Sequence, residues 1–502
     1  MIRNLTQEQN DYSVFLPSIS GFYATFIGKQ RFGDYVDPNR IPKGIGSMEG
    51  LNFLNPKEAA FNYKWALYSA GHADLDTTKF VEKEDMVRNR DRESSWLLGD
   101  SGGFQVAKGL WKGDWTSSTC PLATKKRELV VKWMEAYMDY GMMLDIPTWT
   151  YQDNDAADAT NIRSYNDAVK ATHINAEYYL KNRQGNFKVL NVLQGSNHTN
   201  AEDWYQEFKD YCDPKKYPGN HFNGWAMGGQ NMCDVHLILE RLVHMIHDKL
   251  LEPGLHDVMH FLGTSKLEWA VLLTDIQRAI RKYHNPNFMM TYDCASPFLA
   301  TANGQIYYNI RIDHNDKWSY MMAPSIDDKK YSTDTRKLSD VFLSEPHFND
   351  PKFSQKVPFP AFEDSPITDA CRINDICIYK PGDLNKIGKE GKTSWDSFSY
   401  ALQMAHNVWI HITSTQRSNK LYDEGLYPNM MVYETPTRRD VFRDVVDEIF
   451  SQKDRQKSIA TINKYGTKTQ ANSLWTHIIG TRLKVGKKTI NAEAKFDEFF
   501  TF

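Results

Sequence analysis

The stretch WLLGDSGGF, residues 96–104, is a short apolar run that ends in an acid and a pair of glycines. Five further apolar runs follow it, in GMMLDI (141–146), FKVLNVL (187–193), GWAM (224–227), VMHFL (258–262) and FMMTY (288–292). The intervening stretches 125–140, 161–182, 201–211, 235–251 and 266–283 carry apolar residues three to four positions apart, the period of an α-helix. This alternation predicts a mostly parallel sheet built from right-handed βαβ units.

Polar or glycine-rich residues follow five of the six predicted strands: Asp100–Gly103, Asp145, Gln194–Gly195, Gly228–Gln230 and Asp293. Any one of them is explained equally well by a turn or a helix cap. A doubly wound sheet would concentrate functional groups at one switch point, whereas a barrel places them after many successive strands. The joint pattern therefore favours an α/β fold of the (β/α)8 TIM-barrel type, with insertions and a C-terminal extension.

The expected organisation has five parts. Residues 1–90 contribute to the start of the barrel, and residues 91–312 form the main barrel, with Gln305–Ile312 as a further strand. A polar segment rich in Pro, Asp, Lys and Ser, residues 313–395, is interpreted as an insertion. Residues 396–427 supply the last barrel helix, and residues 428–502 form a basic C-terminal extension.

The C-terminal part contains a dense cationic run. Between Ser451 and Lys488, nine lysines and arginines accompany one acid, Asp454, with Tyr465 and Trp475 interleaved. Such a run can bind phosphates, and it can equally be a solvated basic surface.

Composition limits the class of protein. With 502 residues, 41% hydrophobic and 25% charged, the chain is typical of a globular protein. Its net charge of −3 provides no overall basic field, so a polyanion would have to bind a local patch. The six scattered cysteines favour a reducing compartment, and no apolar run is long enough for a membrane span. The expected location is the cytoplasm, or the host cytoplasm if the protein is virus-encoded.

Two carboxylates stand in distinctive contexts, Asp100 in GDSGGFQV and Asp293 in TYDCASP. A pair of carboxylates that flanks a glycosidic carbon can use one member as nucleophile and the other as proton carrier, which is the retaining strategy. The glycines beside Asp100 allow a planar ligand to approach the backbone closely, and Phe104 could stack on such a ligand.

These residues resemble the signature motifs of the tRNA-guanine transglycosylases, which exchange a guanine in a polynucleotide for a 7-deazaguanine base without breaking the strand. The matching elements occur in the family's order: Asp100–Val106 (DSGGFQV), Leu144-Asp145, Leu193-Gln194-Gly195, Ala226-Met227-Gly228-Gly229, Gly263-Thr264, Asp293-Cys294 with Pro297, and Asn303-Gly304. Together they cover roughly residues 90–312, and the match is weaker around the last barrel helix.

The resemblance implies a role for each matching residue. Asp293 would attack C1′ of the target nucleoside, and Asp100 would act as general acid/base. Asp145 and Gln194 would read the edge of the base, together with the backbone around Gly228 and Gly229. The other expected binding residues are Phe104, which would stack on one face of the base, Ser101, Gly102 and Gly103 of the same motif, and His260, which stands where the family has the methionine that covers the other face.

The family's structural zinc has only a partial match here. Cys371 and Cys377 lie in the right region, in DACRINDIC, where the family has a CxCxxC cluster, and the histidine on the last barrel helix is replaced near Gln416-Arg417. His406 or His411 could substitute for it. Since structural zinc normally requires four ligands, we expect no metal and no other cofactor, with zinc at Cys371 and Cys377 as the alternative.

The expected polynucleotide is DNA. The reduced cysteine cluster, the polar insertion and the lack of a recognisable RNA-binding domain make the chain more similar to the phage and bacterial DNA 7-deazaguanine transglycosylases, whose modified genomes evade restriction. The second substrate would be a 7-deazaguanine base such as preQ0. Alternatives are a transglycosylase acting on tRNA, a non-catalytic nucleic-acid-binding partner subunit and a carbohydrate-active barrel; no membrane partner is expected, and a homodimer stays open.

Overall fold

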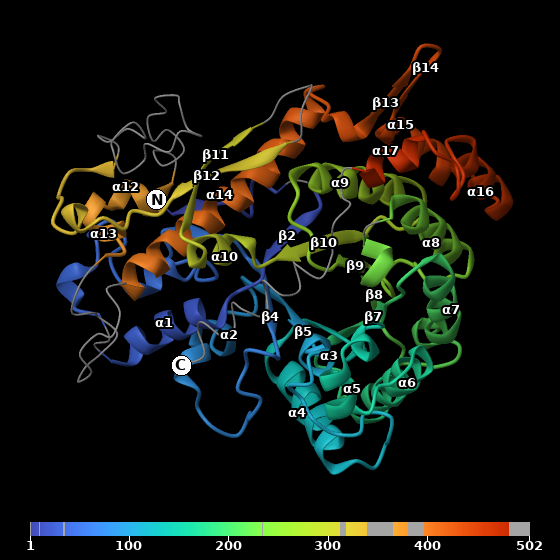
Figure 1. Ribbon diagram of the computed structural model, residues 1–502, viewed down its shortest axis with the longest axis horizontal. Helices are drawn as coiled ribbons and strands as arrows, with labels where there is room; N and C mark the ends of the chain where they lie inside the picture. Colours follow the sequence, from blue (N-terminus) through green and yellow to red (C-terminus); the bar gives the residue numbers. More distant parts are fainter. Residues whose placement is uncertain are drawn as a thin grey trace.

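Eight parallel strands form one sheet that curls into a nearly closed barrel in the computed structural model, which describes residues 2–9, 11–33, 36–232, 234–311, 318–338, 365–379 and 396–480 (Figure 1). The sheet order is β2-β10-β9-β8-β7-β6-β5-β4, and one parallel bridge between Ser18 and Leu67 joins its two ends. The strands are β2 (Val14–Pro17), β4 (Trp65–Ser69), β5 (Trp96–Asp100), β6 (Tyr140–Met142), β7 (Lys188–Leu193), β8 (Gly224–Met227), β9 (Val258–Phe261) and β10 (Met289–Cys294). The expected α/β architecture with a parallel, barrel-like sheet is therefore confirmed.

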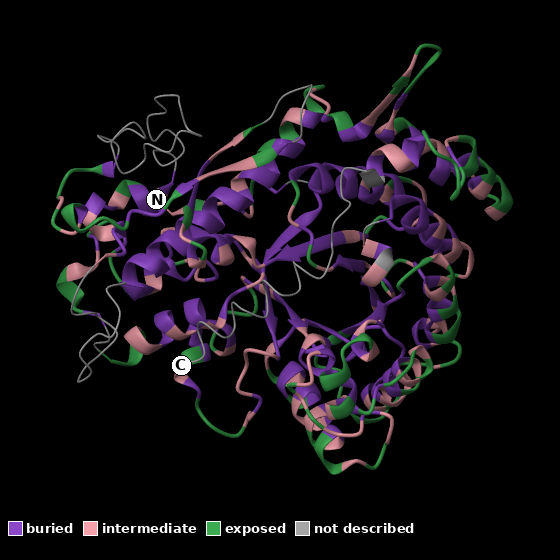
Figure 2. Ribbon diagram, in the orientation of Figure 1, coloured by how far each residue is buried: buried purple, intermediate pink, exposed green. Residues whose placement is uncertain are grey.

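Helices surround the sheet and cover its outer face (Figures 1 and 2). They are α1 (Gly21–Phe32), α2 (Asp85–Arg88), α3 (Gly103–Ala107), α4 (Pro121–Tyr137), α5 (Asn154–Thr160), α6 (Tyr165–Asn182), α7 (His198–Phe208), α8 (Val235–His247), α9 (Leu267–Tyr283), α10 (Ser296–Ala302) and α14 (Ser397–Asp423). Every residue of β8 and β9 is buried, as expected for parallel strands that have side chains on one face and helices on the other. The apolar core therefore lies both inside the barrel and between the sheet and its helices.

The six strands expected from the sequence are β5 to β10, with ends that shift by up to four residues. The first 90 residues supply the other two, β2 and β4. The predicted strand Gln305–Ile312 is not a barrel strand: β11 (Gln305–Arg311) pairs antiparallel with β12 (Ser319–Pro324) in a separate two-stranded sheet. The expected last helix is α14, which packs against β2, α9 and α10 and so fills the gap in the helical ring.

The other described strands and α-helices lie outside the barrel. They are β1 (Arg3–Asn4), β3 (Phe61–Asn62), α12 (Pro366–Ala370), α13 (Ile373–Ile376), β13 (Val432–Thr435), β14 (Arg438–Val441), α15 (Phe442–Ser451), α16 (Arg455–Lys464) and α17 (Leu474–Gly480). Of the expected insertion, residues 318–338 and 365–379 are described, and the rest lies outside the described residues. No described helix combines the length and apolar character that a membrane crossing requires.

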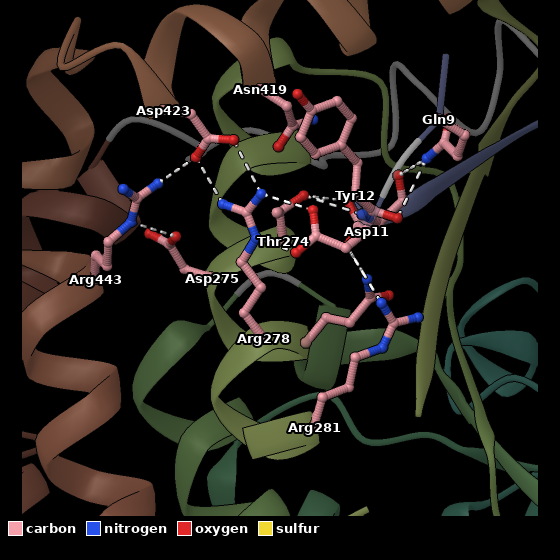
Figure 3. A network of polar contacts seen from close by, with 12 residues as sticks. Gln9, Asp11, Tyr12, Thr274, Asp275, Arg278, Arg281, Asn419, Asp423 and Arg443 are labelled. Atoms are coloured by element: carbon pink, nitrogen blue, oxygen red, sulfur yellow. Dashed lines mark hydrogen bonds and ion pairs between the residues drawn. The ribbon is translucent and has the colours of Figure 1, made fainter. Parts of the chain in front are cut away.

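An ion-pair network fastens the segment after the barrel to the barrel itself (Figure 3). Arg278 of α9 bonds Asp11 at 2.8 Å and Asp423 of α14 at 2.6 Å. Arg443 of α15 bonds Asp423 at 2.8 Å and Asp275 of α9 at 3.1 Å. Because the two arginines share Asp423, the network fixes α9, α14 and α15 relative to one another.

The cationic run is partly neutralised where the structure describes it. Arg455 pairs with Asp248 at 2.6 Å, Lys464 with Glu448 at 2.8 Å and Lys468 with Glu240 at 2.8 Å. Lys453 and Lys457 are exposed. Arg482, Lys484, Lys487 and Lys488 lie outside the described residues. Between Ser451 and Gly480 the run is therefore less cationic than its sequence suggests.

Candidate functional site

A cavity of about 450 Å³ opens at the carboxyl ends of the barrel strands, a size typical of small-molecule sites. The expected site residues that line it are Asp100, Gly103, Phe104, Asp145, Gln194, Gly228, Gly229 and Asp293. A larger cavity of about 840 Å³ lies against α14, and Glu8 is the only acid among the described residues that line it. Paired-carboxylate chemistry is therefore available in the smaller cavity and not in the larger one.

Asp293, near the end of β10, is held through one of its two carboxylate oxygens. Its Oδ1 accepts the backbone N–H of Gly263 at 2.9 Å and lies 3.2 Å from Nε2 of His260. No described residue donates a hydrogen bond to Oδ2. The side chain is 12% exposed, so one oxygen is anchored while the other is left for a ligand in the cavity.

His260 does not lie where the sequence placed it. Its side chain is fully buried within β9 and is not part of the cavity lining, so it cannot cover a face of a bound base. Instead, Nδ1 lies 2.9 Å from Thr291 Oγ1 and Nε2 faces Asp293. The expected stacking role is wrong because the ring lies behind the carboxylate, where it orients Asp293.

Asp100, the last residue of β5, is held by a neighbouring strand. Ser69, at the end of β4, donates its hydroxyl hydrogen to Oδ2 at 2.6 Å, and the backbone N–H of Gly102 approaches Oδ1 at 3.4 Å. Burial raises the pKa of the Asp100 carboxyl, and the negative charge of Asp293 adds to this effect. A carboxyl of this kind spends more time protonated than an exposed one, which suits a proton carrier.

Two residues of the glycine motif shape the loop without lining the cavity. Ser101 is buried, and its hydroxyl approaches the carbonyl of Met143 at 3.4 Å. Gly102 has a φ of +83°, and a Cβ there would lie 2.4 Å from the Trp111 ring. Their expected contact with a substrate is therefore replaced by a role in placing Asp100 and Gly103.

Asp145 and Gln194 form a buried pair on the cavity wall. The Gln194 side-chain amide donates from Nε2 to Asp145 Oδ2 at 2.7 Å. Burial raises the pKa of Asp145 to about 7, with a further contribution from the charge of Asp100. Near neutral pH both protonation states of Asp145 are thus populated. The carboxylate only accepts hydrogen bonds, whereas the protonated carboxyl also donates one.

The raised pKa of Asp145 predicts a pH-dependent gain in stability for Asp145→Asn. The carboxyl has a pKa of 3.8 in the unfolded chain and about 7 in the folded protein, so its ionisation increasingly favours unfolding as the pH rises between these values. An amide carries no such penalty. We expect Tm to increase by roughly a few degrees at about pH 8, with a smaller gain at about pH 6 and almost none at about pH 4.

The measurement is thermal unfolding of both proteins across this pH range. Asp158→Asn is the matched control, because the Asp158 side chain is 71% exposed. A Tm difference that does not vary with pH would contradict the raised pKa.

Glycines allow two loops to touch beside this pair. Gly229 has a φ of +55°, and a Cβ there would lie 2.5 Å from the carbonyl oxygen of Gly195. The buried Asn231 donates from Nδ2 to the carbonyls of Gln194 and Gly228, at 3.0 and 3.2 Å. The loops after β7 and β8 therefore form one wall of the cavity, and its glycines leave that wall free of side chains.

Aromatic rings form an apolar part of the cavity lining. Phe104 and Trp149 both line the cavity, with ring centroids 6.0 Å apart, and the Lys108 ammonium lies 5.4 Å from the Trp149 ring. The cavity is also lined by residues that the sequence motifs did not indicate: Ser69, His72, Trp149, Met232 and Leu262. The run WALYS (65–69) was the available signal for Ser69, since it is an apolar run that ends in a polar residue.

The alternative zinc site is not supported by the described residues. Cys371 and Cys377 are buried, and Cys377 Sγ lies 3.7 Å from the carbonyl of Asp328. His406 bonds the carbonyl of Tyr307 at 2.6 Å, and His411 stacks on Phe15. In the described parts of the chain, the group of metal-binding side chains that converges includes neither cysteine.

No protein-family model matches the chain, and no curated protein matches it in sequence.

Proposed function

We propose that the protein is a transglycosylase that exchanges guanine in DNA for a 7-deazaguanine base such as preQ0, so that the modified genome resists restriction. One observation carries the proposal: Asp100 and Asp293 line the same cavity in different environments. Asp293 has one anchored and one available oxygen, as a nucleophile requires, whereas Asp100 has a raised pKa, as a proton carrier requires.

In the first step, an oxygen of Asp293 forms a bond to C1′ while the bond between C1′ and N9 of guanine breaks. Guanine leaves with the bonding electron pair and takes a proton, which neutral Asp100 can supply. The sugar is now joined to Asp293 by a covalent bond. Gly263 and His260 hold the other oxygen of Asp293, so the attacking carboxylate is oriented in advance.

In the second step, Asp100 takes the proton from N9 of the incoming base. N9 then attacks C1′, and the bond to Asp293 breaks with its electrons returning to the carboxylate. Asp100 thereby regains the proton that it gave to the departing guanine. The DNA strand is not cut, because both steps replace only the bond at C1′.

The remaining cavity residues suit recognition of a guanine-like base. The N1–H and 2-amino groups of such a base donate hydrogen bonds, and the carboxyl of Asp145 can accept them. Gln194 orients that carboxyl through its own hydrogen bond to it. Phe104 and Trp149 provide aromatic surface for a ring, and the wall at Gly228 and Gly229 has no side chains to keep a flat ring away.

DNA is favoured over tRNA by the sequence around Cys371 and Cys377, which lacks the four zinc ligands of the tRNA enzymes. We further infer that residues 313–395 are an insertion in the TIM barrel and that residues 428–502 extend it, with basic residues that contact phosphates without reading sequence. A partner subunit without activity is less well supported, because both carboxylates are present in the cavity.

The proposal predicts that the purified protein transfers labelled preQ0 into duplex DNA that contains guanine, and into tRNA not at all or far more slowly. The measurement is the label retained in each precipitated polymer, with Asp293→Asn as the inactive control. Label in tRNA alone would support the tRNA alternative. Label in neither polymer, with guanine bases and preQ0 both present, would overturn the proposed function.

A further inference from the structure

A second group of chemically reactive side chains lies outside the cavity, at the start of two barrel helices. His198 is the first residue of α7, and His236 and Glu240 lie one turn apart on α8. One ligand atom from each of these three residues lies within 4.8 Å of the other two. Two imidazoles and a carboxylate at this separation match the ligand types and spacing of a transition-metal site.

His236 provides the independent indication that something is bound. Its side chain is 2% exposed, and neither ring nitrogen has a hydrogen-bond partner among the described residues. Nδ1 lies 3.7 Å from a carboxylate oxygen of Glu240, too far for a hydrogen bond. Buried polar groups without partners are costly and rare in proteins, whereas a metal ion would satisfy one of these nitrogens directly.

His198 is already oriented as metal-bound histidines usually are. Its Nε2 lies 2.5 Å from Asp234 Oδ2, while Nδ1 is buried and no described residue forms a hydrogen bond with it. A carboxylate on the far nitrogen of a histidine fixes the ring and its tautomer and raises the basicity of the nitrogen that binds the metal. Asp234 is itself held in place, because it caps α8 by accepting the N–H of Leu237.

We propose that His198, His236 and Glu240 bind one divalent transition metal, of which Zn²⁺ fits this ligand set best. Two imidazole nitrogens and one carboxylate oxygen provide three ligands, and water completes the tetrahedron. Lys468 now pairs with Glu240 at 2.8 Å, so it competes with the metal for that carboxylate.

The position of the site indicates what the metal does. The loop before α7 carries Gln194 and Gly195, and the loop before α8 carries Gly228 and Gly229. A metal bound by the first residue of α7 and the first two turns of α8 would hold these loops together. The site therefore stabilises one wall of the cavity from behind, and the inference does not depend on which reaction the cavity performs.

The test uses the full-length protein, freed of metal and titrated with Zn²⁺ in competition with a coloured chelator, and separately with Co²⁺ to record its visible absorption. We expect one metal per chain and a tetrahedral Co²⁺ spectrum. Glu240→Gln and His198→Asn should lose high-affinity binding, and Asp234→Asn should bind about 10- to 100-fold more weakly. Lys468→Ala should bind more tightly, since Glu240 loses its competitor.

Cys371→Ser with Cys377→Ser is the matched control, and it should bind Zn²⁺ as the parent protein does. Circular dichroism and melting curves would show which variants fold; His198 and Lys468 are both partly exposed, so at least these two changes are expected to be tolerated. No binding of Zn²⁺ or Co²⁺ by the folded parent protein would overturn the proposal. So would binding that survives His198→Asn and Glu240→Gln but is lost in the cysteine variant.

Discussion

Asp293→Asn is expected to abolish base exchange while the protein stays folded. The amide is nearly isosteric with the carboxylate and can still accept the N–H of Gly263, so the pocket should keep its shape. It is, however, a very poor nucleophile, and the covalent bond to C1′ cannot form. We expect exchange to fall by a factor on the order of 10⁴ or more. The measurement is incorporation of labelled preQ0 into DNA over time.

The control for this experiment is Asp158→Asn, which makes the same chemical change at an exposed position and should exchange bases normally. A denaturing gel should show a covalent complex with DNA for the parent protein under trapping conditions and none for Asp293→Asn. Near-normal turnover of Asp293→Asn would show that another group is the nucleophile.

Asp100→Asn is expected to fail later in the cycle. Departing guanine can take its proton from water, but no carboxylate remains to remove the proton from the incoming base. Exchange should slow by about 10²- to 10⁴-fold, the usual contribution of a general acid/base, and the covalent complex should accumulate. The measurement is the amount of covalent protein–DNA complex on a denaturing gel beside the rate of label uptake.

Ser69→Ala is an informative companion to Asp100→Asn, because it removes the 2.6 Å hydrogen bond to Asp100 without touching the carboxyl itself. Loss of a donor to the ionised form raises a carboxyl pKa. The pH at which exchange is half-maximal should therefore rise in Ser69→Ala, whereas Asp100→Asn should lose this pH dependence. If Asp100→Asn accumulates no covalent complex and exchanges bases normally, Asp100 is not the proton carrier.

Strands β5 to β10 could be predicted from the sequence because each is a short apolar run between helical stretches. Strands β2 and β4 were not recognised, because the first 90 residues show no regular alternation of strand and helix. The strand Gln305–Ile312 was recognised but assigned to the wrong partner, because an isolated apolar run does not reveal what it pairs with.

The residues of the site that lie at the ends of strands were predictable from the sequence. Asp100 and Asp293 lie at the carboxyl ends of two parallel strands, and the carboxyl ends of such strands meet at one edge of the barrel. The role of His260 was not predictable, because an apolar run identifies a strand but not which of its side chains reach the cavity. The group at His198, His236 and Glu240 was also not predicted: His236 and Glu240 lie one turn apart on α8, but His198 joins them only when α7 packs beside α8.

The sequence by itself determined that this is an α/β protein with a parallel sheet and a row of polar residues at one edge, since strand and helix periods are local properties of the chain. Only the tertiary structure decided how β2 and β4 complete the ring, which oxygen of Asp293 is held, and how far burial raises the pKa of Asp145. These properties depend on contacts between residues far apart in the chain and on the exclusion of water, and neither exists before the chain has folded.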